Sequence, residues 1–161
     1  MPEFSLSLFV FIAACFAAAM TGAFFGPGKW YAALEKPSWV PPNWAFPVVW
    51  TLMYGMIAAA GWIVWSVAEP GAATLPLVLW ALQLALNALW SPVFFGLKRM
   101  DLGMVVVSGM WISIAATIVA FWPISGIAAG LMVPYLIWVS IAAALNYTVW
   151  KLNPDAHKLA V

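Results

Sequence analysis

Aromatic side chains recur at helical spacing in three apolar segments of the chain. Phe46, Trp50 and Tyr54 follow one another at intervals of four residues. Two further stripes mix rings with small or polar residues at spacings of three and four: Asn87, Trp90, Ser91 and Phe94, and Tyr135, Trp138, Ala142 and Asn146. Residues three or four apart share one face of a helix. Core packing accounts for any one stripe alone, but the polar Asn87 and the small Ala142 among the rings favour a ligand cavity with a few orienting groups.

A loop rich in aromatic residues and proline precedes the first stripe, over residues 26–42. Pro41 and Pro42 disfavour helix just before Asn43, a good N-cap, and Pro47 falls in the first turn, where a missing N–H costs least. The sequence therefore predicts a helix that starts near Asn43. The stiff loop before it is placed to act as a lid over the cavity.

The composition requires a membrane around these elements. Hydrophobic residues make up 66% of the 161 and charged residues 7%, against about 45–50% and 25% in soluble domains. Five uncharged apolar runs reach the ~20 residues that a bilayer-spanning helix needs, over residues 4–25, 43–67, 74–95, 103–122 and 125–150. They do not alternate as transmembrane strands do. The predicted fold is an all-α membrane protein, in which residues 1–161 form a single bundle of five transmembrane helices.

The basic residues orient this bundle. With five spans, every Lys and Arg falls on one side of the membrane: Lys29, Lys36, Lys98, Arg99, Lys151 and Lys158. The positive-inside rule then places the C-terminus in the cytoplasm and the N-terminus outside, and favours an inner membrane over an outer membrane. The first span lacks a basic segment before it, so we interpret it as a retained helix rather than a signal peptide.

The spans lack the residues that most membrane chemistry needs. Their polar side chains are Gln83, Asn87, Asn146, hydroxyls and indoles, without an acid or a base for ion coupling or hydrolysis. The single histidine, His157, lies in the tail, and the single cysteine, Cys15, lies inside the first span. We therefore expect no metal site, no ligated haem iron, no intramolecular disulfide, no required cofactor and no nucleic-acid partner.

The remaining tryptophans have simpler interpretations. Those near predicted helix ends are expected in the interfacial aromatic belt: Trp30, Trp65, Trp122 and Trp150. Those within spans are expected to face lipid or neighbouring helices: Trp62, Trp80 and Trp111.

Three segments together resemble a known family. "WYAALEKPSWVPPNW", "ALNALWSPVFFGLKR" and "VPYLIWVSIAAALNYTVW" are similar to the hallmark segments of the TspO/MBR family, which comprises bacterial tryptophan-rich sensory proteins and the mitochondrial translocator protein (peripheral benzodiazepine receptor). The resemblance extends over essentially the whole chain. It implies a five-helix bundle, usually a homodimer, that binds porphyrins such as protoporphyrin IX and, in animal members, cholesterol and benzodiazepine-type drugs.

The resemblance also implies a site and a role. Carried over by motif, the ligand pocket comprises Tyr31, Trp39, Pro41, Phe46, Trp50, Asn87, Trp90, Trp138 and Ala142. Bacterial members are linked to control of tetrapyrrole metabolism and to stress responses, and some degrade protoporphyrin in light, a role that would fall here on Trp50 and Trp138. The leading expectation is thus a tetrapyrrole-binding sensor. The alternative is a transporter or translocator of porphyrin or a sterol-like lipid.

Two further patterns concern lipid contact and association. Leu145, Tyr147 and Lys151 satisfy a loose cholesterol-type motif, for which an interfacial tyrosine and a snorkelling lysine are the alternative. Ala81, Ala85 and Ala88 form a small-residue strip on the third span, expected to be the homodimer face. Packing within the bundle and a competing strip at Gly126 and Gly130 are the alternatives.

Overall fold

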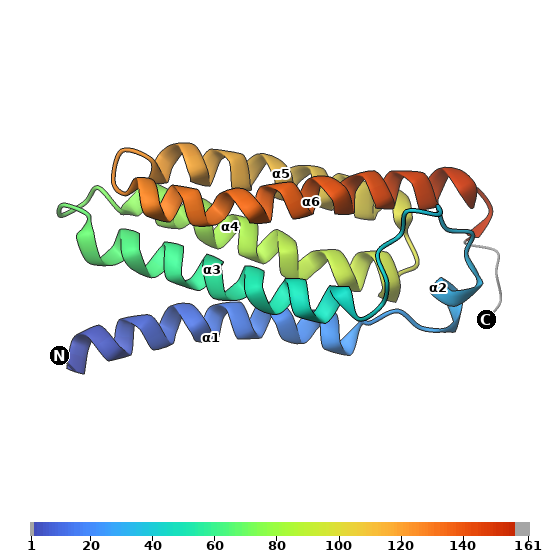
Figure 1. Cartoon of the computed structure of the whole chain (residues 1–161), viewed down its shortest axis with the longest axis horizontal. Coiled ribbons are helices and arrows are strands. Elements are labelled where there is room, and N and C mark those ends of the chain that lie inside the picture. Colours follow the sequence, from blue (N-terminus) through green and yellow to red (C-terminus); the bar gives the residue numbers. More distant parts are fainter. Residues whose placement is uncertain (1, 157–161) are drawn as a thin grey trace.

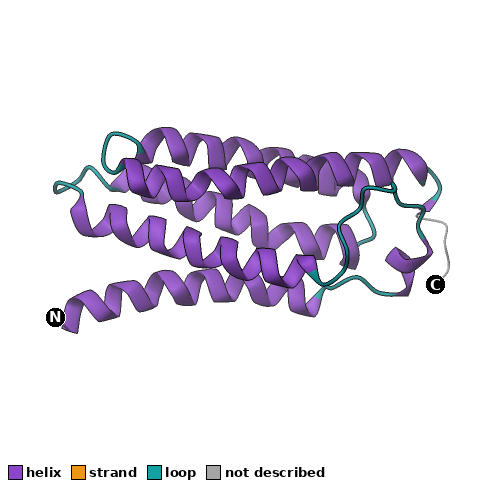
Figure 2. Ribbon diagram, in the orientation of Figure 1, coloured by secondary structure: helices purple, strands orange, loops and turns teal. Residues whose placement is uncertain are grey.

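Five long helices form an elongated bundle (Figures 1 and 2). The computed structural model describes residues 2–156, with side chains from residue 6, and no strand occurs in that range. His157 and Lys158 lie outside the described residues. The spans are α1 (Pro2–Phe24), α3 (Ala45–Val67), α4 (Thr74–Ser91), α5 (Met100–Phe121) and α6 (Gly126–Leu152), with a short α2 (Lys29–Ala33) in the first loop. All five long helices are apolar enough to cross a membrane. The predicted fold class is confirmed.

The start of α3 differs from the prediction. Asn43 does not cap this helix, because Trp44 occupies the N-cap position and no side chain there bonds a free amide. A turn satisfies the first amide instead, with the Ala45 N–H donating to the Pro42 carbonyl at 2.9 Å. By contrast, α6 has a side-chain cap, since the Ser125 hydroxyl accepts from the Ala128 N–H.

A π-helical segment, η1 (Pro92–Gly96), continues α4 and was not predicted. Pro92 has no N–H to continue the α-helical ladder, and the Leu97 N–H reaches five residues back to the Pro92 carbonyl. The wider turn brings Phe94 and Phe95 together, with ring centroids 4.9 Å apart. Both rings line the cavity described below.

Close packing around Trp80 joins α1, α3 and α4. The buried Trp80 of α4 lies edge-on to Phe11 of α1, and its indole N–H donates to the Ile57 carbonyl of α3 at 2.9 Å. Gly61 faces the same indole and leaves no space for a side chain. Trp80 is therefore a packing residue, as the sequence suggested.

The first loop, the connection from α4 to α5 and the end of α6 lie together at one end of the bundle, and the N-terminus lies at the other (Figure 1). Trp30 is here, but its assignment to the interfacial belt is wrong: it is 4% exposed and its indole N–H donates to the Ala156 carbonyl. Trp65 and Trp122, at the opposite end, are mostly exposed, as residues of an aromatic belt would be.

Candidate functional site

A cavity of about 570 Å³ opens at the end of the bundle that carries the first loop. Its size lies within the roughly 300–1,000 Å³ of small-molecule sites. Every long helix and the first loop contribute to its lining, which comprises Ala19, Thr21, Gly22, Ala23, Pro27, Tyr31, Pro41, Asn43, Phe46, Pro47, Trp50, Thr51, Tyr54, Asn87, Trp90, Ser91, Phe94, Phe95, Val107, Met110, Trp138, Ile141, Ala142, Leu145, Asn146 and Val149.

The cavity brings together most of the residues that the sequence singled out. Eight of the nine proposed ligand contacts are in its lining: Tyr31, Pro41, Phe46, Trp50, Asn87, Trp90, Trp138 and Ala142. The ninth, Trp39, is 48% exposed and is not part of the lining. The loop around Trp39 has no helical period, so the sequence could not indicate which of its rings face inward.

Aromatic rings from α3 and α6 form one part of the cavity. Phe46 and Trp50 lie edge-on to Trp138, with centroids 5.9 and 6.5 Å away. Trp50 also contacts Tyr54 and Tyr135, at 5.5 and 6.2 Å. Edge-to-face contacts of this kind hold rings at set angles. The cavity therefore presents rigid π surfaces rather than mobile side chains.

A second group of rings comes from α4, η1 and α2. Trp90 stacks on Phe94 at 4.8 Å and lies edge-on to Phe95 at 5.5 Å. Tyr31 of the first loop packs against Phe95 at 5.4 Å. Burial raises the pKa of the Tyr31 phenol above its ordinary value.

A chain of hydrogen bonds crosses four helices beside these rings. The Tyr54 hydroxyl donates to Asn87 Oδ1 at 2.6 Å, and Asn87 Nδ2 donates to the Tyr135 hydroxyl at 2.9 Å. Tyr135 in turn donates to Met110 Sδ. Both polar atoms of Asn87 are thus engaged within the protein, where they join α3, α4 and α6. Gln83, one turn before Asn87 on α4, is fully buried but does not line the cavity.

A second buried amide joins α4, α5 and α6. Asn146 Oδ1 accepts from the Trp90 indole N–H at 3.2 Å, and Asn146 Nδ2 donates to the Met100 carbonyl at 2.9 Å. Gly103 permits this approach, because a Cβ there would lie 3.0 Å from Asn146 Oδ1. The sequence placed Asn146 in a stripe but did not predict its hydrogen-bond partners. Met100 and Trp90 are 46 and 56 residues away, and no local pattern connects them to Asn146.

The cavity is uncharged. None of the lining residues is Asp, Glu, Lys, Arg or His. Lys36 lies at its edge, with Nζ 4.7 Å from the ring centroid of Tyr31 and bonded to the Leu34 carbonyl. Lys98 belongs to a separate depression beside Arg99 and Trp150. An apolar ligand fits inside, and an anionic group on it would meet Lys36 at the rim.

One residue of the cavity lining has a buried donor that is unpaired. The indole N–H of Trp138 is shielded from solvent and has no hydrogen-bond partner within residues 2–156. Leaving such a group unpaired costs about 1–3 kcal/mol. No group of three or more His, Cys, Asp or Glu residues in the described part of the chain is arranged to hold a metal ion.

Contributions from α1 were missed by the sequence analysis. Thr21 and Gly22 line the cavity, and a Cβ at Gly22 would make an ordinary 3.7 Å contact with Ser91 Oγ. The first span has neither an aromatic stripe nor a polar stripe, so no pattern distinguished its inward face. Phe95 was missed because the predicted stripe ended at Phe94, although Phe95 follows Ser91 by four residues and the same spacing rule would have included it.

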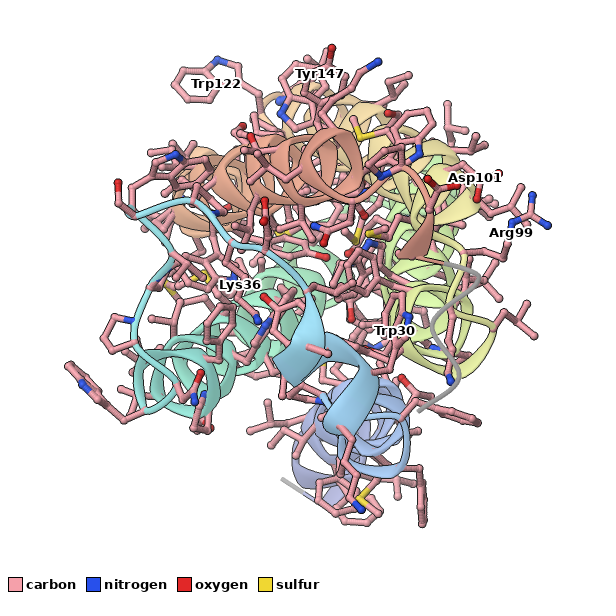
Figure 3. The ribbon with its side chains drawn as sticks, turned by 90° about the vertical axis from the view of Figure 1, so that its right-hand side faces the viewer. Trp30, Lys36, Arg99, Asp101, Trp122 and Tyr147 are labelled. Carbon is pink, nitrogen blue, oxygen red and sulfur yellow. The ribbon has the colours of Figure 1, made fainter. Side chains whose placement is uncertain are left out.

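The residues of the lipid motif do not share one surface. Leu145 is buried and lines the cavity, whereas Tyr147 lies at the periphery of the bundle (Figure 3). Lys151 Nζ lies 5.5 Å from the ring centroids of both Tyr147 and Trp150. A lipid on the outer surface would meet Tyr147 and Lys151 but not Leu145.

The small-residue strips lie on outer faces of the bundle. Ala81 and Ala85 are exposed, and Ala88 is half-buried against the core. Gly126 and Gly130, on the competing strip, are exposed as well, with no atom within 4 Å of a Cβ placed at either. Both strips are therefore accessible to a second helix.

The sequence of the chain is similar to those of known proteins. The model of the TspO/MBR family matches residues 11–151. Protein CrtK of Rhodobacter capsulatus is 49% identical over 159 residues, which cover 98% of this chain and 99% of the relative. The tryptophan-rich sensory protein of Cereibacter sphaeroides is 46% identical, over 91% and 93% of the two chains. The human translocator protein is 42% identical, over 78% of this chain and 75% of its own.

Proposed function

Because the chain belongs to the TspO/MBR family, whose relatives are named sensory and translocator proteins, we propose that its cavity binds a tetrapyrrole of the protoporphyrin IX type. In this proposal the protein is a membrane sensor that couples porphyrin binding to tetrapyrrole metabolism and the stress response. It is an integral membrane protein with five spans, and we place its N-terminus outside and its C-terminus in the cytoplasm of a bacterial inner membrane.

The observation that carries this proposal is an uncharged cavity walled by rings from α2, α3, α4, η1 and α6. A flat macrocycle offers π faces to these rings, and each aromatic pair contributes about 0.5–1.5 kcal/mol beyond the burial of its area. The cavity amides Asn87 and Asn146 are already bonded within the protein. Trp138 presents its ring to the cavity, while its N–H is buried and unpaired within the described residues.

The carboxylates of the porphyrin are proposed to lie toward the first loop and Lys36. We expect Lys36→Met to weaken protoporphyrin IX binding about three- to fivefold, since an exposed charge pair contributes up to ~1 kcal/mol. A neutral benzodiazepine-type ligand should bind the variant as tightly as it binds the wild type. Equilibrium titration of both ligands into purified protein measures the difference.

Lys98→Met is the matched control, because Lys98 is at the same end of the bundle but belongs to the other depression. It should leave both affinities unchanged. Equal weakening of porphyrin and neutral ligand by Lys36→Met would refute this orientation and indicate a loss of loop structure instead.

A photochemical activity is proposed for Trp50 and Trp138, whose centroids are 6.5 Å apart in the cavity lining. A bound, excited porphyrin would lie beside two electron-rich indoles that can react with it in the presence of oxygen. Trp138→Phe should slow light-driven loss of the porphyrin spectrum at saturating protein, relative to wild type. A rate of loss that equals the rate for free porphyrin in every variant would exclude this role.

Translocation of porphyrin or a sterol-like lipid is the alternative function, favoured by the exposed Tyr147 and Lys151 as an outer lipid contact. Net flux of porphyrin into proteoliposomes would support it over a sensor. We also propose a homodimer through Ala81, Ala85 and Ala88, because this strip is accessible on α4. A monomeric mass by light scattering in detergent would contradict the dimer.

A further inference from the structure

The first loop is hydrogen-bonded to two residues that follow the C-terminus of α6, Asn153 and Ala156. Asn153 follows the last residue of α6 and forms a reciprocal pair with the backbone of Glu35: the Glu35 N–H donates to Asn153 Oδ1, and Asn153 Nδ2 donates to the Glu35 carbonyl, both at 2.9 Å. The Trp30 indole N–H donates to the Ala156 carbonyl at 3.1 Å.

The amide of Asn153 suits this contact because it can both donate and accept, and because a further hydrogen bond holds it against α6. A side-chain amide carries one acceptor and two donors, so it can pair with the backbone N–H and C=O of a single residue. Its Nδ2 also donates to the Val149 carbonyl at 2.8 Å, which ties the side chain to α6. The amide therefore connects a rigid transmembrane helix to the middle of the loop.

The second contact, between Trp30 and Ala156, combines a hydrogen bond with apolar packing. Trp30 is buried in a cluster with Leu34, Phe94, Val149 and Ala156. Its ring lies 6.0 Å from that of Phe94. In the view along the bundle axis, Trp30 lies inside the ring of helices, while Trp122 and Tyr147 lie at the periphery (Figure 3).

These contacts lie beside the ligand site but outside its lining, although Trp30 packs against two lining residues, Phe94 and Val149. Pro27, Tyr31 and Pro41 of the loop line the cavity, whereas Trp30, Glu35, Asn153 and Ala156 do not. We propose that Asn153 and Ala156 form a latch for residues 26–42, and that opening this latch sets the rate at which a ligand enters and leaves the cavity. The inference rests on the proposed function, because it assigns a kinetic role to the edge of the same site.

A latch has a kinetic signature that a binding contact lacks. If the loop must open for both association and dissociation, weakening the latch raises both rate constants and leaves their ratio unchanged. Asn153→Leu removes both bonds to Glu35 and should raise the association and dissociation rates of protoporphyrin IX about tenfold. Trp30→Phe keeps a ring against Phe94 but loses the N–H, and should raise both rates about threefold.

The experiment is stopped-flow mixing in the dark, with hydrogen–deuterium exchange of the unliganded protein as a second measurement. Thr148→Ala, on α6 but outside the cavity and the latch, is the control and should match wild type. Exchange at the Glu35 amide should rise about tenfold or more in Asn153→Leu, because that N–H loses its acceptor.

The outcomes separate the latch from the ligand site. Unchanged exchange at Glu35, or faster dissociation without faster association, would overturn the latch. Absence of saturable porphyrin binding in wild type and control alike would refute the proposed function. In that case faster loop exchange in both latch variants would still support the mechanical role of Asn153 and Ala156.

Discussion

Ala142→Phe is expected to weaken protoporphyrin IX binding by at least about a hundredfold, equivalent to about 2.8 kcal/mol or more. Ala142 lines the cavity on the same face of α6 as Trp138, so a benzyl group would extend into the space between the aromatic rings. A rigid macrocycle cannot reshape itself around this group. The protein itself should remain folded, because the added ring enters a hollow rather than a packed core.

Ala144→Phe is the matched control for this substitution. Ala144 is on the same helix, two residues away, but is exposed on the outer face and does not line the cavity. Its variant should bind porphyrin as wild type does. Dark titrations of the three proteins, with circular dichroism to verify helix content, measure the effect. Equal affinity in Ala142→Phe and Ala144→Phe would mean that porphyrin binds elsewhere.

Gly61→Ala is expected to produce the largest loss of stability from a single added methyl group. A Cβ at Gly61 would lie 2.8 Å from atoms of both Phe11 and Trp80. These rings are packed against each other with centroids 5.1 Å apart, and the Trp80 N–H is bonded to Ile57. They cannot yield without disturbing the contacts among α1, α3 and α4. Overpacking of this kind costs about 1–3 kcal/mol.

Gly55→Ala, on the same helix, separates this steric effect from helix propensity. No atom lies within 4 Å of a Cβ at Gly55, and alanine in a helix is favoured over glycine by up to ~1 kcal/mol. We therefore expect Gly55→Ala to unfold at the same temperature as wild type or above it, and Gly61→Ala to unfold clearly below. Thermal unfolding in detergent, followed by circular dichroism, provides the comparison. Equal stability of the two variants would contradict the packing described for Trp80.

The sequence predicted those parts of the site that depend on local periodicity. Phe46 and Trp50, and likewise Trp138 and Ala142, are one helical turn apart, so a spacing rule places each pair on one face whatever the tertiary structure. The five spans follow similarly from the length of the apolar runs. The confirmed family resemblance rests on the same segments.

The sequence could not predict features that depend on distant contacts. Trp30 is near the end of a span and suggested an interfacial residue, but its partner carbonyl is 126 residues away. Asn43 has the side chain of an N-cap, yet a turn closed by the Pro42 carbonyl leaves it without that role. The π-helical segment after Pro92 depends on the hydrogen bond from the Leu97 N–H to the Pro92 carbonyl, which no spacing pattern indicated. In each case a contact or a change of helical geometry outweighs the local preference.

Quenching of tryptophan fluorescence by protoporphyrin IX in the dark tests the central claim most directly, with wild type compared with Trp50→Phe, Trp138→Phe and Trp62→Phe. Trp62 serves as the control because it does not line the cavity. We predict saturable quenching of wild type, with a midpoint that moves to higher porphyrin concentration in Trp50→Phe and Trp138→Phe but not in Trp62→Phe. Quenching that never saturates, and that is the same in all four proteins, would contradict the assignment of the aromatic cavity as a porphyrin site.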